Sequence, residues 1–238
     1  MQLLKEKRFS ELKLLLNDIS PMDVASMLNG LSNEDLILTF RLLSKDLAAE
    51  TFVEMDSDNQ ELLISAFNDK ELKAIVDELY LDDVVDIIEE MPANVVNRIL
   101  KYTDSATRNM INEVLKYPKD SAGSIMTVEY VDLKKDMTVE DAFEKIRKTG
   151  VDKETIYTCY VTNKNRKLLG IVTVKDLLLA EKNTMLGDIM KTNIIYATTL
   201  EDKEVVARKF EKYDFIAMPV VDKELRLVGI ITVDDAVD

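Results

Sequence analysis

The sequence contains no histidine and a single cysteine, Cys159, among its 238 residues. One thiol excludes an internal disulfide and suits a reducing compartment such as the cytosol. Zinc and copper sites built from imidazole and thiolate ligands are disfavoured for the same reason. A bound metal ion is therefore expected to be a hard cation held by oxygen atoms, such as Mg²⁺, Ca²⁺ or Mn²⁺.

Several sequence motifs are also absent, and their absence excludes further classes of function. The sequence has no apolar run near the roughly 20 residues that span a bilayer, no secretory signal, no phosphate loop of the GxxxxGK[ST] type and no nucleophile elbow. Histidine, the commonest general acid or base, is missing, and no pair of carboxylates stands out among the 45 present. We therefore expect the chain not to be an enzyme and, taken alone, to be soluble and unable to transport anything.

The chain is acidic, with 31 Lys and Arg against 45 Asp and Glu and a net charge of −14. Residues 1–120 hold 13 of the basic and 24 of the acidic side chains, so most of the excess negative charge lies there. This balance argues against nucleic acid as a partner and against docking to anionic lipid, because both need a basic surface. It is compatible with a cation as the ligand.

The first 117 residues show helical periodicity that is interrupted every 10–13 residues or so. Each interruption carries a residue typical of a helix N-terminus, followed by Leu, Ile, Val or Phe at helical spacing. The predicted starts lie near Ser20, Ser32, Asp46, Ser57, Asp69, Asp82, Pro92 and Asp104. Short helices are marginal alone, so we expect antiparallel helix pairs stacked into a superhelix.

A break at Pro118 and Gly123 separates this part from a region where strands alternate with helices. That region contains an internal repeat, because Gly170-Ile171-Val172-Thr173-Val174-Lys175-Asp176 returns as Gly229-Ile230-Ile231-Thr232-Val233-Asp234-Asp235. Each copy is preceded by a β-rich run and, further upstream, by a methionine, Met126 or Met190. The repeat predicts two modules of the same strand and helix order.

The two copies resemble tandem cystathionine-β-synthase (CBS) domains, which pair with each other and often bind adenine nucleotides or metal ions. Three further segments resemble the cytosolic region of the MgtE family of magnesium channels and transporters. These segments are Ala48-Ala49-Glu50, Glu78-Leu79-Tyr80-Leu81-Asp82-Asp83-Val84-Val85-Asp86 and Asp120-Ser121-Ala122-Gly123-Ser124-Ile125-Met126-Thr127. The resemblance covers nearly the whole chain in the family's order.

The resemblance implies an α plus α/β architecture, with an all-helical superhelical domain at 1–119 followed by CBS modules at 120–183 and 184–238. Asp238 lies inside a helix expected to begin at Asp234, so we expect a connecting helix and a transmembrane pore domain beyond residue 238 in a longer protein. It further implies a homodimer formed through the CBS modules, placed at the cytoplasmic face of the cell membrane.

An acidic run on one predicted helix is the first candidate metal site. It contains Asp82, Asp83, Asp86, Glu89 and Glu90, with Asp82 and Asp86 on one face. Negative charge at a helix N-terminus accounts for the first two residues alone, whereas clustered oxygens are also what a hard cation requires, so both interpretations stay open. The family resemblance implies that Asp82, Asp86 and Glu50 contribute to Mg²⁺ binding.

Further candidate Mg²⁺ ligands lie in the CBS region. Helix N-terminal positions are an alternative explanation for each carboxylate taken singly. The resemblance implies metal-site roles for the side chains of Asp202, Glu204, Asp214, Asp235 and Asp238, and for the backbone carbonyls of Ser124 and Glu211. An acidic residue at position 211 departs from the family pattern and adds charge there.

The repeated Thr-x-x-Asp motif is the candidate nucleotide site. An Asp in this position can accept both ribose hydroxyls, although it also suits an ordinary helix N-terminus. The resemblance implies ATP as a second ligand of the first module, with Asp176, Lys175, Thr158 and Phe215 as the contributing residues. Two of these depart from the family pattern: Lys175 lacks the planar guanidinium of Arg, and Thr158 stands where an aromatic ring is expected.

We therefore expect a regulatory region in which Mg²⁺ bridges acidic surfaces, compacts the dimer and closes the pore by negative feedback. Two alternatives stay open. One is an adenine-nucleotide sensor in which the metal is incidental, and the other is a helical-repeat scaffold that binds a protein partner.

Overall fold

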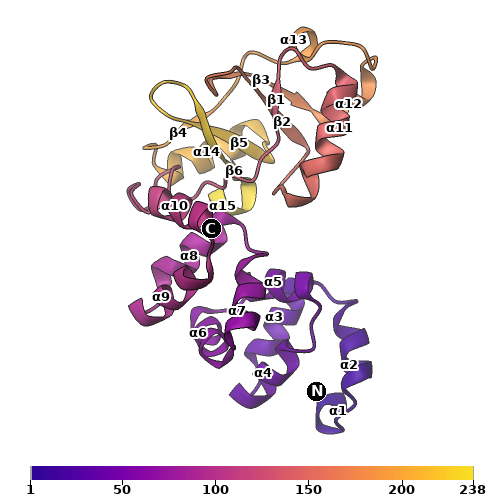
Figure 1. The fold of residues 1–238 in the computed structure, drawn as a ribbon, viewed down its shortest axis with the longest axis vertical. Helices are drawn as coiled ribbons and strands as arrows, with labels where there is room; N and C mark the ends of the chain where they lie inside the picture. Colours follow the sequence, from indigo (N-terminus) through magenta and orange to yellow (C-terminus); the bar gives the residue numbers. More distant parts are fainter. Residues whose placement is uncertain (1, 238) are drawn as a thin grey trace. The chain divides into compact units, whose positions relative to one another are not determined.

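The computed structural model describes residues 2–237, and within them the chain divides into two compact units. The first unit comprises residues 2–79 and 83–111, and the second comprises residues 80–82 and 112–237. Figure 1 shows the first unit as helices and the second as two small sheets with their covering helices.

Short helices make up the N-terminal half of the chain. They are α1 (Gln2–Lys5), α2 (Phe9–Leu16), α3 (Pro21–Asn29), α4 (Asn33–Phe40), α5 (Lys45–Val53), α6 (Ser57–Ala66), α7 (Asp69–Val76), α8 (Leu81–Glu90), α9 (Ala93–Tyr102) and α10 (Ser105–Val114). Helix α3 packs against α5, α5 against α7 and α7 against α9, while α4 packs against α6. This succession of neighbours confirms the predicted stack of helix pairs.

Side-chain caps explain where several of these helices begin. The hydroxyl of Ser20 accepts a hydrogen bond from the Asp23 N–H at the start of α3, and Ser32 does the same at the start of α4. Helix α7 has a full capping box, in which Asn68 accepts from the backbone while the Glu71 carboxylate accepts from the Asn68 N–H. The predicted helix starts therefore agree with the structure to within a residue or two.

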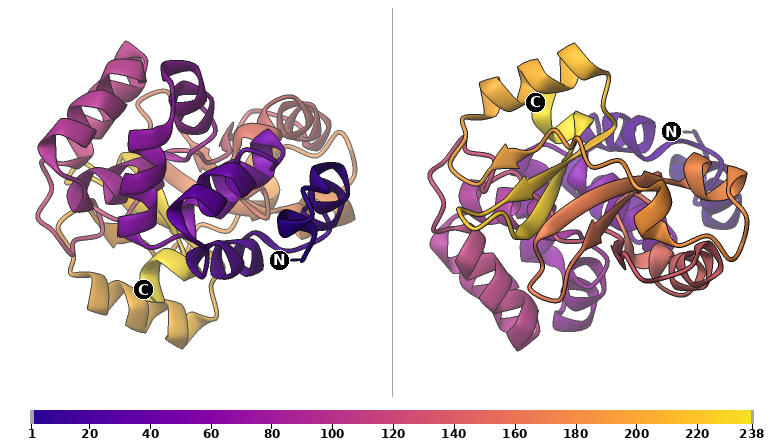
Figure 2. Two further views of the ribbon diagram at one scale, coloured as in Figure 1. Left: turned by 90° about the horizontal axis from the view of Figure 1, so that it is seen from below. Right: turned by 90° about the horizontal axis from the view of Figure 1, so that it is seen from above.

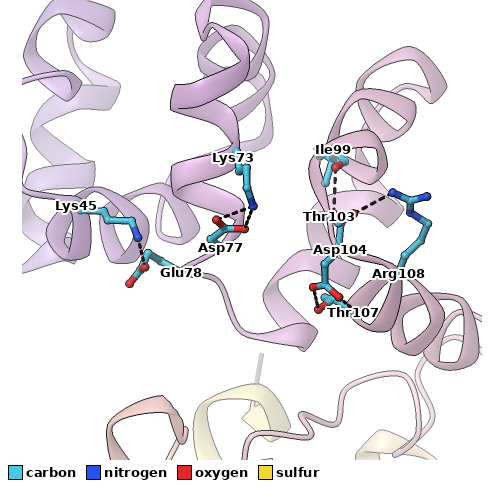
Figure 3. Close-up of polar contacts among 9 residues, drawn as sticks. All are labelled: Lys45, Lys73, Asp77, Glu78, Ile99, Thr103, Asp104, Thr107 and Arg108. Carbon is cyan, nitrogen blue, oxygen red and sulfur yellow. Dashed lines mark hydrogen bonds and ion pairs between the residues drawn. The ribbon is translucent and has the colours of Figure 1, made fainter.

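Polar contacts also hold the ends of later helices in the first unit (Figure 3). Lys73 Nζ lies 2.7 Å from Asp77 Oδ1, and Lys45 forms an ion pair with Glu78 just beyond it. After α9, the Thr103 hydroxyl donates to the Ile99 carbonyl over 3.0 Å. The first two contacts join side chains, and the third adds a second hydrogen bond to a carbonyl that also accepts from the Thr103 N–H.

The second unit contains two modules with the same topology. The first consists of β1 (Asp132–Lys134), α11 (Val139–Thr149), the 3₁₀ turn η1 (Gly150–Asp152), β2 (Thr158–Thr162), β3 (Leu168–Thr173) and α12 (Val174–Leu179). The second consists of α13 (Leu186–Ile189), β4 (Ala197–Thr198), α14 (Lys203–Tyr213), β5 (Ala217–Val221), β6 (Leu227–Thr232) and α15 (Val233–Val237). In each sheet the first strand is parallel to the second and the second is antiparallel to the third, which confirms the repeat. Figure 2 shows the two sheets edge to edge in the view from above.

The two modules exchange short segments. Thr127, which precedes the first module's strands, pairs with Ile230 in β6 of the second module. Lys191, which precedes the second module's strands, pairs with Ile171 in β3 of the first module. Because each sheet gains an edge from the other half of the repeat, the modules fold as one unit.

The repeated Gly and Met residues have a packing role at these exchanged segments. A Cβ atom added to Gly170 would lie 2.7 Å from Met190 Sδ, and one added to Gly229 would lie 2.7 Å from Met126 Sδ. Real Cβ atoms do not approach sulfur so closely, so only glycine allows the neighbouring chain to lie against β3 and β6. Gly and Met therefore recur at the same spacing in both copies because each Gly and Met pair forms the same contact.

Candidate functional site

An open cleft of about 480 Å³ lies beside the start of α12 in the second unit. Its volume falls within the range usual for small-molecule sites. The lining residues come from β2 and the turn before it, from the β3–α12 junction and from the turn before β5. They are Tyr157, Thr158, Thr173, Val174, Lys175, Leu178, Leu179 and Ile216.

Polar groups gather where β3 passes into α12. Thr173 accepts a hydrogen bond from the Asp176 N–H, and Asp176 Oδ2 accepts from the Thr173 N–H (3.0 Å) and hydroxyl (2.6 Å). This capping box fixes the side chain of Asp176 at the start of α12, against Thr173, which lines the cleft. The ammonium of Lys191 lies 3.4 Å from the same oxygen.

The carboxyl of Asp176 is held in its ionised form. Burial raises its pKa, but the two hydrogen bonds from Thr173 and the nearby Lys191 ammonium lower it by more, so the pKa lies below the ordinary value. All contacts of Asp176 go to Oδ2.

The rest of the cleft is apolar and exposed. Tyr157 is 65% exposed and Leu179 is 78% exposed, which leaves an aromatic face and an aliphatic wall accessible from solvent. Of the residues expected from the sequence, Thr158 and Lys175 line the cleft, and Asp176 is hydrogen-bonded to Thr173, which also lines it. Phe215 instead stacks on Tyr213, with ring centroids 5.5 Å apart, and its neighbour Ile216 lines the cleft.

The equivalent edge of the second module has a different charge. The sequence repeat and the paired strands place Asp234 where the first module has Lys175, and Thr127 where it has Lys191. The hydroxyl of Thr232 donates to Asp235 as Thr173 does to Asp176. At these positions the first edge carries Lys175, Asp176 and Lys191, whereas the second carries Asp234, Asp235 and Thr127.

The acidic candidates of the N-terminal half lie on two helices. Glu50 is exposed near the end of α5, Asp82 is 6% exposed in the first turn of α8, and Asp86 is exposed one turn later. Glu90, at the end of α8, accepts a hydrogen bond from the Ser57 hydroxyl of α6. The spacing of Asp82 and Asp86 thus matches the predicted helix.

The acidic candidates of the second module surround α14. Asp202 is the N-cap of this helix and accepts from the Glu204 N–H over 2.9 Å. Glu204 lies 3.9 Å from Arg208, Glu211 is exposed, and Asp214 is the left-handed C-cap residue with φ of 51°. Capping explains the positions of Asp202 and Asp214 without excluding a metal role.

Ser124 is buried, and its hydroxyl exchanges hydrogen bonds with the backbone of Ser121. Asp235 is half-buried in α15, and Asp238 lies outside the described residues. Among residues 2–237, no group of three or more His, Cys, Asp or Glu side chains is arranged to hold a metal ion. The exposed carboxylates have the oxygen donors that Mg²⁺ prefers, and Mg²⁺ commonly keeps several waters when it binds only one or two of them.

Known proteins share this fold over its whole length. The model of the MgtE intracellular N domain matches residues 19–120, and the CBS domain model matches residues 122–183 and 186–238. A crystal structure of the cytosolic domain of the Mg²⁺ channel MgtE in complex with ATP superposes with a TM-score of 0.93, at 35% identity, covering all of this chain and 97% of the other. The chain belongs to the MgtE family.

Two curated MgtE relatives extend the comparison. The magnesium transporter MgtE of Thermus thermophilus is 35% identical over 99% of this chain, and that of Bacillus subtilis is 29% identical over 99%. This chain spans about half the length of each, 53% and 52%. The soluble part of a magnesium transporter also superposes, with a TM-score of 0.91 at 28% identity over all of this chain and 93% of the other. Across residues 2–237 no helix is both long and apolar enough to cross a membrane.

Proposed function

We propose that this chain is the Mg²⁺-sensing regulatory region of a magnesium transporter, acting at the cytoplasmic face of the membrane and without enzymatic activity of its own. The observation that carries the proposal is the match over the whole chain to the cytosolic domain of a Mg²⁺ channel. The absence of histidine and the single buried cysteine support an oxygen-bound cation as the ligand.

The mechanism follows from the charge of the chain. With a net charge of −14, its acidic surfaces repel one another, and at low cation concentration this repulsion favours separation. Mg²⁺ bound by carboxylates such as Glu50, Asp86, Asp202 and Asp214 removes the repulsion and adds ligand bonds. A conformation that binds the ion more tightly gains free energy as its concentration rises. Several weak sites acting together make the response steep, and the compact state closes the pore.

Neutral variants test the metal-binding step. Glu50→Gln with Asp86→Asn should reduce the increase in melting temperature that Mg²⁺ produces at constant ionic strength, measured by scanning calorimetry. Glu34→Gln with Asp58→Asn is the matched control, because it removes the same charge from exposed helix positions outside the candidate set. Equal Mg²⁺ responses in both double variants would contradict the assignment of these ligands.

A second ligand is supported by the cleft. We propose that it binds an adenine nucleotide, since it combines an exposed aromatic face with Lys175 and the ionised Asp176, and a structural relative forms a complex with ATP. Asp176→Ala should abolish ATP binding in titration calorimetry. ATP binding that survives this substitution would contradict the proposal.

A homodimer is the third part of the proposal. Leu179 in α12 and Val237 in α15 are 78% and 72% exposed, and a second copy of the chain would cover such side chains. Leu179→Glu with Val237→Glu should shift sedimentation toward the monomer. Val151→Glu, at a position that is 85% exposed in η1, is the control, and dimers that persist in the double variant would contradict this interface.

A further inference from the structure

Lys191 occupies a defined position at the edge of the first module although it belongs to the segment that leads into the second. Its N–H donates to the Ile171 carbonyl over 2.8 Å, and its carbonyl accepts from the Ile171 N–H over 3.0 Å. The backbone of Lys191 is thereby fixed to β3. Its side chain is 59% exposed, so the ammonium retains freedom to move.

Two short contacts connect the ammonium of Lys191 to a residue that lines the cleft. It is 3.4 Å from Asp176 Oδ2, and the same oxygen is 2.6 Å from the hydroxyl of Thr173, which lines the cleft. Lys175 lines the cleft from α12. Lys191, from a different segment of the chain, is therefore linked to the cleft through Asp176 and Thr173.

The second module shows that a lysine is not needed here for folding. Thr127 pairs with Ile230 as Lys191 pairs with Ile171, and it lies against Gly229 as Lys191 lies against Gly170. The same backbone arrangement thus forms with a threonine. The charge of Lys191 is consequently available for a role at the ligand site.

We propose that Lys191 makes the cleft selective for phosphorylated nucleotides over nucleosides. The inference rests on the proposed nucleotide binding and identifies the residue that distinguishes a charged ligand from a neutral one. When a ribose hydroxyl engages Asp176, the ammonium exchanges part of its contact with this carboxylate for a phosphate oxygen. A partly desolvated charge-assisted hydrogen bond of this kind is stronger than a neutral one. A neutral nucleoside gives Lys191 no such partner.

Titration calorimetry with ATP and with adenosine tests the proposal. Lys191→Met should weaken ATP binding about five- to tenfold and leave adenosine binding nearly unchanged, so the ratio of the two affinities falls. Lys191→Arg should restore most of the ATP affinity, because it retains the charge. Lys182→Met is the control, since Lys182 is 80% exposed and pairs with Glu140.

Two results would overturn this inference. Equal losses for ATP and adenosine in Lys191→Met would show that Lys191 acts only on the shape of the cleft, and an unchanged ATP affinity would show that it does not contact the phosphates. If the unsubstituted chain binds neither ATP nor adenosine, the proposed nucleotide function itself fails, and the role of Lys191 fails with it.

Discussion

Arg166 and Leu225 occupy equivalent positions in the two β-hairpins, and both have a left-handed backbone with φ of 61°. Each carbonyl accepts a hydrogen bond from the other module, Arg166 from the Leu227 N–H at 2.9 Å and Leu225 from the Leu168 N–H at 3.1 Å. The unusual conformation turns these carbonyls toward the neighbouring hairpin. Two strained residues thereby help to join the modules.

Replacing Leu225 by glycine should stabilise the protein. A Cβ atom in the left-handed region costs about 1 kcal/mol, and Leu225 is 46% exposed, so little buried area is lost. Glycine has more freedom in the unfolded chain, which offsets part of this relief, so chemical denaturation should show a net gain of at most about 0.5 kcal/mol for Leu225→Gly. Leu225→Ala keeps the Cβ atom and should show no gain, and equal stabilities for the two variants would contradict the strain argument.

Gly229 should tolerate no side chain. A Cβ atom there would lie 2.7 Å from the Thr127 carbonyl and 2.7 Å from Met126 Sδ, so the exchanged segment would have to move. Gly229→Ala should lower the free energy of unfolding by about 2 kcal/mol or more. Gly30→Ala is the control, because its nearest neighbour would be 3.8 Å away. Similar stabilities of the two variants would show that the segment adapts freely.

Arg98 should stabilise the helical unit through the end of α6. Its guanidinium donates to the carbonyls of Ile64 and Phe67, which lack intrahelical partners. Arg98→Met keeps the aliphatic stem and should cost about 1–3 kcal/mol in thermal or chemical unfolding. Lys101→Met on the same helix removes an exposed charge and should cost less than about 0.5 kcal/mol. Equal costs would show that Arg98 acts through its charge and not through these two hydrogen bonds.

The ionisation of Asp176 should depend on Lys191. Because the folded-state pKa of Asp176 lies below the unfolded value of about 3.9, its contribution to stability is present above that value and is lost as the pH falls through the folded pKa. Lys191→Met should raise the pKa of Asp176 and move this loss to higher pH. Carbon NMR of the Asp176 carboxyl, recorded in both proteins from pH 2 to 6, measures the shift. An unchanged titration would contradict the contact between the two side chains.

Local signals made most of the fold predictable. Capping residues such as Ser20 and Ser32 mark helix starts because they hydrogen-bond within one turn. The repeated Gly and Met residues predicted two equivalent modules, since their contacts recur in both. The acidic and helical character of the N-terminal half also follows from its residues alone, whereas the CBS and MgtE family was found by resemblance.

The site was harder to predict because it depends on contacts between residues that are far apart in the sequence. Thr158, expected from the family resemblance, lines the cleft, but so does Tyr157, which was not predicted. Ile216 lines it in place of the expected Phe215, because a resemblance between sequences does not show which of two neighbouring side chains faces the cleft. Lys191 was missed because strand pairing with Ile171, and no sequence motif, brings it to Asp176. The available signal was a difference between the two copies of the repeat: Lys191 follows Met190, whereas Thr127 follows Met126.

The proposed function requires Mg²⁺ to change the conformation of this chain through its carboxylates. Small-angle X-ray scattering across a millimolar Mg²⁺ titration, with ionic strength held constant by monovalent salt, tests it most directly. We expect a cooperative decrease in the radius of gyration, with a smaller decrease for Glu50→Gln with Asp86→Asn than for the control Glu34→Gln with Asp58→Asn. A radius of gyration that stays constant from zero to saturating Mg²⁺ would contradict the account.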